Sequence, residues 1–113
     1  MSSHTDCLFC KIVAGEIPAK VVYQDEQLLA FHDIAPKAET HLLVIPKRHI
    51  ENLNDLSHSD AELMSHLMLK LPEIAAQQGL TGFRTITNTG VEGGQEVFHM
   101  HFHILGGKRL PGF

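Results

Sequence analysis

Val97-Phe98-His99-Met100-His101-Phe102-His103-Ile104-Leu105 is the stretch that decides the fold, because histidine and apolar residues alternate along it with a period of two. Successive side chains of an extended strand point to opposite faces. We therefore expect the three histidines on one face, about 6.6 Å apart, with Met100, Phe102 and Ile104 anchored in a core on the other. A rigid row of imidazoles suits proton transfer, nucleophilic attack or metal binding. The alternative is an ordinary half-buried strand whose polar face happens to be histidine.

The composition is that of one globular domain. The chain has 113 residues, of which 43% are hydrophobic and 19% charged, as is usual for soluble proteins. Its net charge of −4 and the lack of any basic run argue against nucleic-acid binding. Nine histidines make the charge strongly dependent on pH. Because so small a domain buries a limited share of its surface, a dimer would help to stabilise it.

The N-terminal sequence predicts a loose polar tail over residues 1–6 and no signal peptide. No segment approaches the roughly 20 apolar residues needed to cross a bilayer, so we expect a cytoplasmic protein that does not bind membranes. Cys7 and Cys10 form a C-x-x-C pair. In a reducing compartment such a pair indicates metal binding or redox chemistry rather than a structural disulfide.

The hydrophobic pattern predicts an α+β fold with a mainly antiparallel five-stranded sheet, one short helix and one long helix. The long helix should open with the S-x-x-E capping box of Ser59–Glu62, be disturbed by Pro72 and stop at Gly79. The short helix is expected over 8–14, and the strands over 21–24, 28–31, 41–45, 83–88 and 97–105.

Two features flank the histidine stretch. The glycine loop 90–95 directly precedes it, and adjacent glycines let backbone N–H groups approach an anion. This loop is either an ordinary hairpin turn or a cradle for a phosphate or carboxylate. His41 opens the most apolar strand, where it can meet the histidine row or serve as a structural residue.

The two cysteines suggest a metal centre. Thiolates at C-x-x-C spacing, with His49 and His99 from distant segments, would complete a tetrahedral Cys₂His₂ zinc site. Two other interpretations remain open: Cys10 as a small buried hydrophobic residue of the helix, and a thioredoxin-like redox pair, although the βαβ context of that motif is absent.

The sequence resembles the histidine triad superfamily, and within it the Hint branch. The alternating His99–Leu105 stretch matches the histidine triad motif, and the resemblance continues in order from residue 7 to 107. The other segments that carry it are Phe9–Ile12, Glu16–Pro18, Ala30–Ile34, Thr40–Lys47, Gly93–Gln95 and Gly106–Gly107.

The resemblance implies a homodimeric purine nucleoside 5′-phosphoramidate hydrolase that works through a nucleotidyl-histidine. His101 would be the nucleophile, since imidazole both attacks phosphorus and leaves it readily. His103 would hold the phosphate, and His41 and His99 would support protonation and orientation.

The resemblance also implies the nucleotide contacts. These are Asn88 and the backbone of Gly94, Gln95 and Glu96 for the phosphate, Asp33 and Ile34 for the ribose, and Phe9, Ile12 and Leu43 for the purine, together with His101 and His103.

The sequence departs from animal members of the superfamily at Glu96, where they carry a serine thought to help protonate the leaving amine. Glu96 either takes over that role or contributes only its backbone N–H. Some bacterial relatives bind structural zinc through a C-x-x-C, a histidine at the position of His49 and the first triad histidine. Cys7, Cys10, His49 and His99 match that set.

Three other functions compete with phosphoramidate hydrolysis. They are dinucleoside polyphosphate hydrolysis, as in the fragile-histidine-triad branch, nucleotide or partner binding with vestigial catalysis, and metal storage on the histidine-rich strand. The segment Glu16–Ala19 favours the Hint branch over the first, and retention of all three triad histidines argues against the second.

Overall fold

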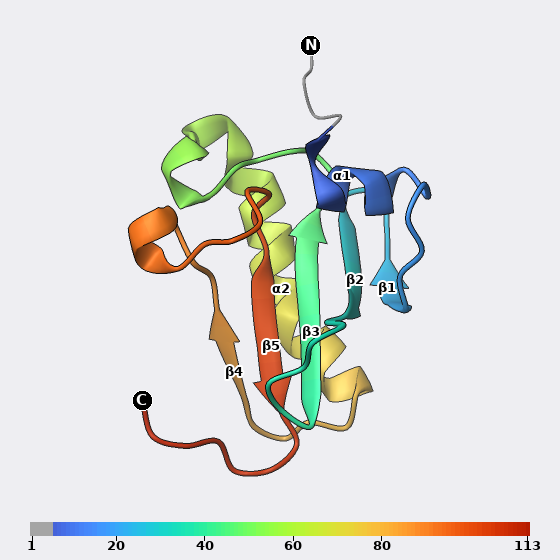
Figure 1. Cartoon of the computed structure of the whole chain (residues 1–113), viewed down its shortest axis with the longest axis vertical. Helices are drawn as coiled ribbons and strands as arrows, with labels where there is room; N and C mark the ends of the chain where they lie inside the picture. The colour runs from blue at the N-terminus through green and yellow to red at the C-terminus, as the bar shows by residue number, and fades with distance from the viewer. Residues whose placement is uncertain (1–5) are drawn as a thin grey trace.

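A five-stranded antiparallel sheet organises the molecule (Figure 1). The structure is a computed structural model that describes residues 6–113. The strands are β1 (Val21–Gln24), β2 (Leu28–His32), β3 (Thr40–Pro46), β4 (Phe83–Ile86) and β5 (Phe102–Gly106). Their order in the sheet is β1-β2-β3-β5-β4, with each neighbouring pair antiparallel. The predicted fold class is therefore confirmed.

The central strand β3 is buried on both faces because a helix covers each side of the sheet. The long helix α2 (Ala61–Gln77) packs on one face with Leu42 and Val44. The short helix α1 (Leu8–Val13) packs on the other face with Leu43 and Ile45. This double burial explains why the strand sequence is almost continuously apolar.

The helix ends follow the predicted glycines, whereas the predicted capping box is wrong. The chain leaves α1 through Gly15, at φ +80°, and leaves α2 through Gly79, at φ +81°. The capping box is formed by Ser57 and Asp60, and a 3-10 turn separates it from α2, so Ser59 does not cap the helix. The spacing S-x-x-[D/E] occurs both over residues 57–60 and over residues 59–62, and the position of the 3-10 turn determines which of the two forms the capping box. The helix continues across Pro72, which lies on its exposed side.

The strand predicted over residues 97–105 is shorter than expected and begins only at Phe102. The ladder between β3 and β5 ends at the Val44–Phe102 pair. Before that point the Met100 N–H donates to the Ile50 carbonyl, 2.6 Å away, and the His101 carbonyl accepts from Thr87 Oγ1. The alternation of faces nevertheless holds, because Met100, Phe102 and Ile104 all enter the core beside α2.

β1 has the predicted bounds, and the other boundaries lie within two residues of the predicted ones, with the largest strand difference at β4, which ends at Ile86 instead of residue 88. Of the predicted N-terminal tail, residues 1–5 lie outside the described residues. Among residues 6–113, no helix combines the length and the apolar character needed to span a membrane.

Candidate active site and metal centre

Backbone contacts fix the ring of His101 in one tautomer. Its Nδ1 lies 2.7 Å from the His99 carbonyl oxygen, which can only accept, so Nδ1 carries the proton. The lone pair is therefore on Nε2. Phe9 packs edge-on against the ring, with the centroids 5.2 Å apart, and only 7% of His101 is exposed. An imidazole that is oriented by such a contact and has its lone pair on Nε2 is in the form that attacks an electrophile.

A second chain of contacts fixes His103 in the opposite tautomer. The Lys37 N–H donates to His41 Nδ1 over 3.0 Å, so the proton of neutral His41 is on Nε2. His41 Nε2 then donates to His103 Nδ1 over 2.8 Å. The proton of His103 is consequently on Nε2, which makes that atom a hydrogen-bond donor.

Burial keeps this pair of rings neutral near pH 7. Desolvation, reinforced by the neighbouring His101 and His41, lowers the pKa of His103 to about 4, although Asp33 opposes the shift. Burial likewise lowers the pKa of His41, against the effect of Asp33, whose Oδ2 lies 3.4 Å from His41 Nε2. The His101 and His103 rings are neighbours, with centroids 5.0 Å apart. The site therefore places a ring with its lone pair on Nε2 beside a ring with its proton on Nε2.

Asp33, His41 and His103 are close enough to form a metal-ligand set, but the tautomers argue against metal binding there. A metal on His41 Nε2 would need the lone pair on the atom that carries the proton, while Nδ1 accepts from Lys37. We interpret this group as a hydrogen-bonded relay.

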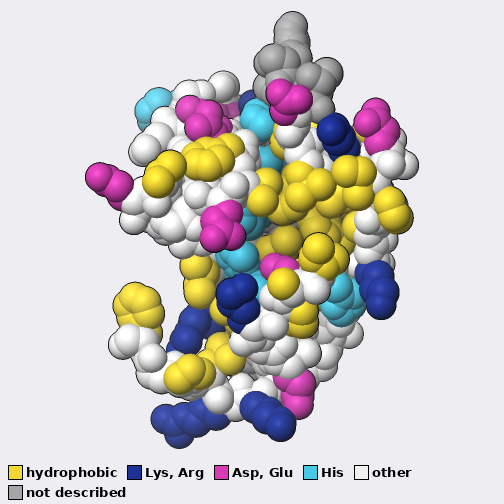
Figure 2. Space-filling model, viewed as in Figure 1, with side chains coloured by type: hydrophobic (Ala, Val, Ile, Leu, Met, Phe, Trp, Pro, Cys, Tyr) yellow, Lys and Arg dark blue, Asp and Glu magenta, His cyan; other side chains and the backbone are white. Residues whose placement is uncertain are grey.

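An apolar surface lies next to the histidines. Figure 2 shows histidine side chains in a hollow bordered by a hydrophobic patch. Phe9 and Leu43 are buried and share a cluster with half-buried Ile12. Ile34 is fully exposed and follows Asp33, whose Oδ1 accepts from the Ala35 N–H. The three residues predicted to contact the purine therefore lie together in an apolar cluster. The two residues predicted to contact the ribose lie on a loop, where Ile34 is exposed.

The glycine loop forms a closed turn in front of the histidines. The N–H of Gly94 donates to the Val91 carbonyl, and that of Gln95 to the Gly90 carbonyl. Asn88 Nδ2 donates to the carbonyl of Gly93. Within residues 6–113 the Glu96 N–H has no such partner, so among the three backbone N–H groups predicted to contact the phosphate it is the one that is available. The Glu96 side chain is exposed.

The four predicted metal ligands come together. Cys7 Sγ lies 3.2 Å from His99 Nδ1, Cys10 Sγ lies 3.2 Å from His49 Nδ1, and Cys10 Sγ lies 3.5 Å from His99 Nδ1. All four ligand atoms lie within 4.8 Å of one another. Zinc bound tetrahedrally by sulfur and nitrogen brings its ligands to about 3.5 Å from one another. The cluster can therefore hold a metal such as zinc.

The surroundings of the cluster favour metal binding. His99 Nε2 donates to the Pro46 carbonyl over 2.8 Å, which leaves the Nδ1 lone pair facing the sulfurs. The Cys10 N–H donates to Cys7 Sγ, which would stabilise a thiolate there. Without metal, burial and the proximity of Cys7 raise the pKa of Cys10 to about 12. His99 is fully buried, so it faces the cysteines and not an open substrate site.

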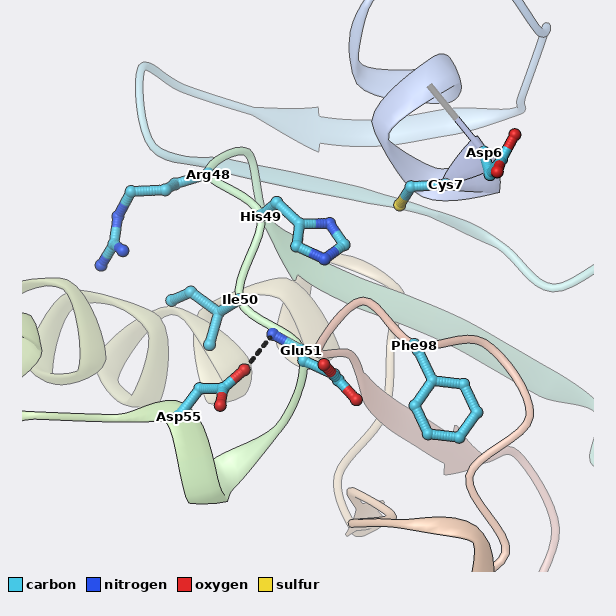
Figure 3. Close-up of a pocket in the computed structure, with 8 residues that line it drawn as sticks. All are labelled: Asp6, Cys7, Arg48, His49, Ile50, Glu51, Asp55 and Phe98. Atoms are coloured by element: carbon cyan, nitrogen blue, oxygen red, sulfur yellow. Dashed lines mark hydrogen bonds between the residues drawn. The ribbon is translucent and has the colours of Figure 1, made fainter. Parts of the chain in front are cut away.

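A cavity of about 600 Å³ lies on the outer side of this cluster. Figure 3 shows the Cys7 sulfur pointing toward the His49 ring, with Glu51 and Phe98 at one side and Arg48 directed away. Neither His101 nor His103 lines this cavity. It is therefore separate from the place where the nucleophile and the donor lie.

The sequence predicted that these histidines and cysteines come together, but it gave no sign of the backbone groups that orient them. These are the Lys37 N–H and the carbonyls of Pro46 and His99, which fix the tautomers. Backbone groups have no residue-specific signal in a sequence. Asn52 was also missed; it is buried and donates to the Gln95 side chain.

Comparison with known proteins agrees with this geometry. Residues 6–111 match the family model described as "Scavenger mRNA decapping enzyme C-term binding". Protein HitA of Neisseria gonorrhoeae is 53% identical over 102 residues, which cover 89% of this chain and 95% of that protein. The chain belongs to the HIT family. The predicted histidine triad resemblance is confirmed at this level.

Solved HIT structures have the same fold. A histidine triad protein from Clostridium difficile superposes with a TM-score of 0.93 at 47% identity, covering 100% of this chain and 99% of that one. A HIT family hydrolase from Legionella pneumophila superposes with a TM-score of 0.90 at 48% identity, covering 93% and 96%. The predicted HIT-like fold is thereby confirmed.

Proposed function

We propose that this HIT protein hydrolyses the P–N bond of purine nucleoside 5′-phosphoramidates, as a member of the Hint branch. The observation that carries the proposal is the pair of opposite tautomers: His101 holds a lone pair on Nε2, and His103 holds a proton on Nε2. One ring is prepared to attack phosphorus and the neighbouring ring to donate to a phosphate oxygen. The hydrolase designation of the Legionella pneumophila relative gives further support.

In the first step, His101 Nε2 attacks the phosphorus in line with the P–N bond. That bond breaks, and its nitrogen takes up a proton from solvent and departs as the amine. His103 Nε2–H donates to a phosphate oxygen, with the Glu96 N–H as a second donor. The His99 carbonyl accepts from His101 Nδ1, and this contact becomes stronger as the ring gains positive charge.

In the second step, water attacks the phosphorus of the nucleotidyl-histidine. The P–N bond to His101 breaks, the imidazole recovers its lone pair, and the nucleoside monophosphate departs while the proton of the attacking water passes to solvent, which balances the proton taken up in the first step. Imidazole suits both steps because it is a capable nucleophile and a good leaving group. His41 keeps His103 in the donating tautomer throughout the cycle.

The Cys/His cluster has a structural role in this proposal. Zinc there would crosslink three distant segments, and four protein ligands would leave no position for an activated water. The cluster holds the residue whose carbonyl orients His101. His99 thus acts in catalysis through its backbone.

Turnover of an AMP-amine phosphoramidate by wild type and His101→Gly tests the proposal. We expect wild type to release AMP and the variant to lose at least about 10⁴-fold in kcat, because it lacks the attacking group. Quenching wild type during turnover with denaturant at alkaline pH, where the P–N bond of a nucleotidyl-histidine survives, should leave one nucleotidyl group on His101, detected by peptide mass spectrometry. His58→Ala, at an exposed histidine, is the matched control and should keep full activity.

The competing substrate is a dinucleoside polyphosphate, which contains P–O–P bonds in place of P–N. The description of the matching family model names a decapping enzyme, so both substrates belong in the assay. Preference for diadenosine polyphosphate over the phosphoramidate would refute the proposed substrate class. Full activity of His101→Gly would refute the assigned nucleophile.

A further inference from the structure

Gln95 is a buried side chain that the proposed reaction does not use directly. Only 5% of the residue is exposed. Its Oε1 accepts from Asn52 Nδ2 over 3.0 Å and from the Gly90 N–H over 2.8 Å. Its Nε2 donates to the Glu51 carbonyl over 2.8 Å and to the Val97 carbonyl over 3.1 Å. A primary amide can make four hydrogen bonds, and Gln95 makes all four with other groups of the protein.

The four partners belong to two different segments. Gly90 opens the glycine loop and Val97 lies two residues beyond its last residue, so the amide joins the chain on the two sides of the loop. Glu51 and Asn52 belong to the segment that also carries His49 of the Cys/His cluster. Figure 3 shows this segment, His49 to Glu51, lying near Phe98, which follows the loop. Gln95 therefore closes the loop and attaches it to the metal-binding side of the site.

Fixing the loop matters because the loop leads into the nucleophile. Glu96, whose N–H is available for the phosphate, is the next residue, and His101 follows five residues later. A displacement of about 1 Å at a reacting centre can cost about 10²-fold in rate. The same displacement weakens ground-state binding less, since a flexible phosphate contact can adapt.

We propose that Gln95 is a positioning residue whose side-chain amide sets the glycine loop, and with it the Glu96 N–H, relative to His101. The expected effect on kcat rests on the proposed phosphoramidate hydrolysis, whereas the expected effect on the loop does not. Asn52 is the supporting partner, because its Oδ1 caps the following turn and its Nδ2 is thereby directed at Gln95.

Gln95→Met tests this inference, since it keeps a similar shape and removes all four hydrogen bonds. We expect kcat for the AMP-amine phosphoramidate to fall by about tenfold or more, with KM within about threefold of wild type. Amide hydrogen exchange should speed up at Gly90, Gly94 and Gln95 and stay unchanged in α2. Gln27→Met, at an exposed glutamine, should behave as wild type.

Asn52→Ser is a milder variant, and it still tests the inference if Gln95→Met does not fold. Serine also caps helical turns well, so the turn after residue 52 is kept while one of the four bonds is lost. We expect a smaller fall in kcat, again with little change in KM. The inference is overturned if folded Gln95→Met keeps the wild-type kcat, if only KM rises, or if protection is lost uniformly across the fold.

The two proposals fail in different ways. A wild type that cleaves no phosphoramidate contradicts the proposed function, and hydrogen exchange then still decides whether Gln95 sets the loop. If wild type cleaves the phosphoramidate and Gln95→Met cleaves it equally well, only this inference is contradicted.

Discussion

At the residue scale, the site depends on which ring nitrogen carries a proton. Four histidines are each held by a neighbour: His41 by the Lys37 N–H, His99 by the Pro46 carbonyl, His101 by the His99 carbonyl and His103 by His41. In the proposed function, neighbouring rings with equal intrinsic chemistry thereby serve as a relay donor, a metal ligand, a nucleophile and a phosphate donor.

The low pKa of His103 predicts a loss of stability in acid. Burial holds this pKa at about 4, below its ordinary value of 6.5. The unfolded chain therefore binds this proton at higher pH than the folded chain, and the free energy of unfolding falls as the pH drops from about 6.5 to about 4. We expect His103→Gln to lose less stability than wild type over that window.

Urea unfolding at about pH 7.5 and about pH 5 measures this difference. His58→Gln, at an exposed histidine, should keep the wild-type pH dependence. An equal loss of stability in wild type and His103→Gln would show that His103 does not contribute.

The Cys/His cluster predicts a metal requirement for stability. We expect wild type to bind one zinc ion and Cys10→Ser to bind none, because the variant lacks one of two thiolate ligands. At free zinc about 100 times its Kd, binding contributes about 2.7 kcal/mol to the free energy of unfolding. Metal analysis and thermal unfolding with and without chelator measure both effects.

His32→Gln, at an exposed histidine outside the cluster, should retain the metal and respond to the chelator as wild type does. A wild type purified from zinc-supplemented medium with no metal, and with the same stability in chelator, would contradict the prediction.

At the scale of elements, α2 stabilises the sheet through one face only. Leu67 is fully buried in the core, whereas 65% of Leu69 is exposed two residues later. Leu67→Ala should reduce the free energy of unfolding by about 3 kcal/mol, since it removes buried methyl groups and leaves a cavity.

Leu69→Ala is the matched control and should change stability by less than about 0.5 kcal/mol. Denaturant unfolding of the two variants compares them directly. Similar losses for both would mean that the exposed face of α2 is also covered in solution.

At the scale of the whole molecule, we propose that the chain forms a homodimer through the β4 edge of the sheet. β4 is an edge strand with Phe83 and Ile86 partly exposed, and such an edge is a template for pairing with a second copy. The other edge strand, β1, has an irregular register between Val21 and Tyr23, and bulges of this kind discourage pairing.

Ile86→Lys tests the proposed dimer by placing a charge on that edge. We expect sedimentation to give the mass of two chains for wild type and of one chain for the variant. Val21→Lys, at the exposed β1 edge, should remain dimeric. A monomeric wild type, or dissociation caused by the β1 variant instead, would refute the assignment.

From the sequence alone we could predict the fold class, the two faces of the histidine stretch and the four members of the Cys/His cluster. Those features depend on residue type and spacing. Met100, Phe102 and Ile104 enter the core as the period of two requires, and Gly15 and Gly79 follow helices because they supply positive φ.

The tautomer of each histidine, in contrast, depends on contacts that exist only in the folded chain. The contacts that set each tautomer come from backbone groups of distant segments, such as the Pro46 carbonyl on His99 and the Lys37 N–H on His41. The side chain of Gln95 can connect the glycine loop to residues 51 and 52 because the fold brings these segments together. A backbone carbonyl or N–H is common to almost every residue, so its effect on a side chain depends on where the fold places it.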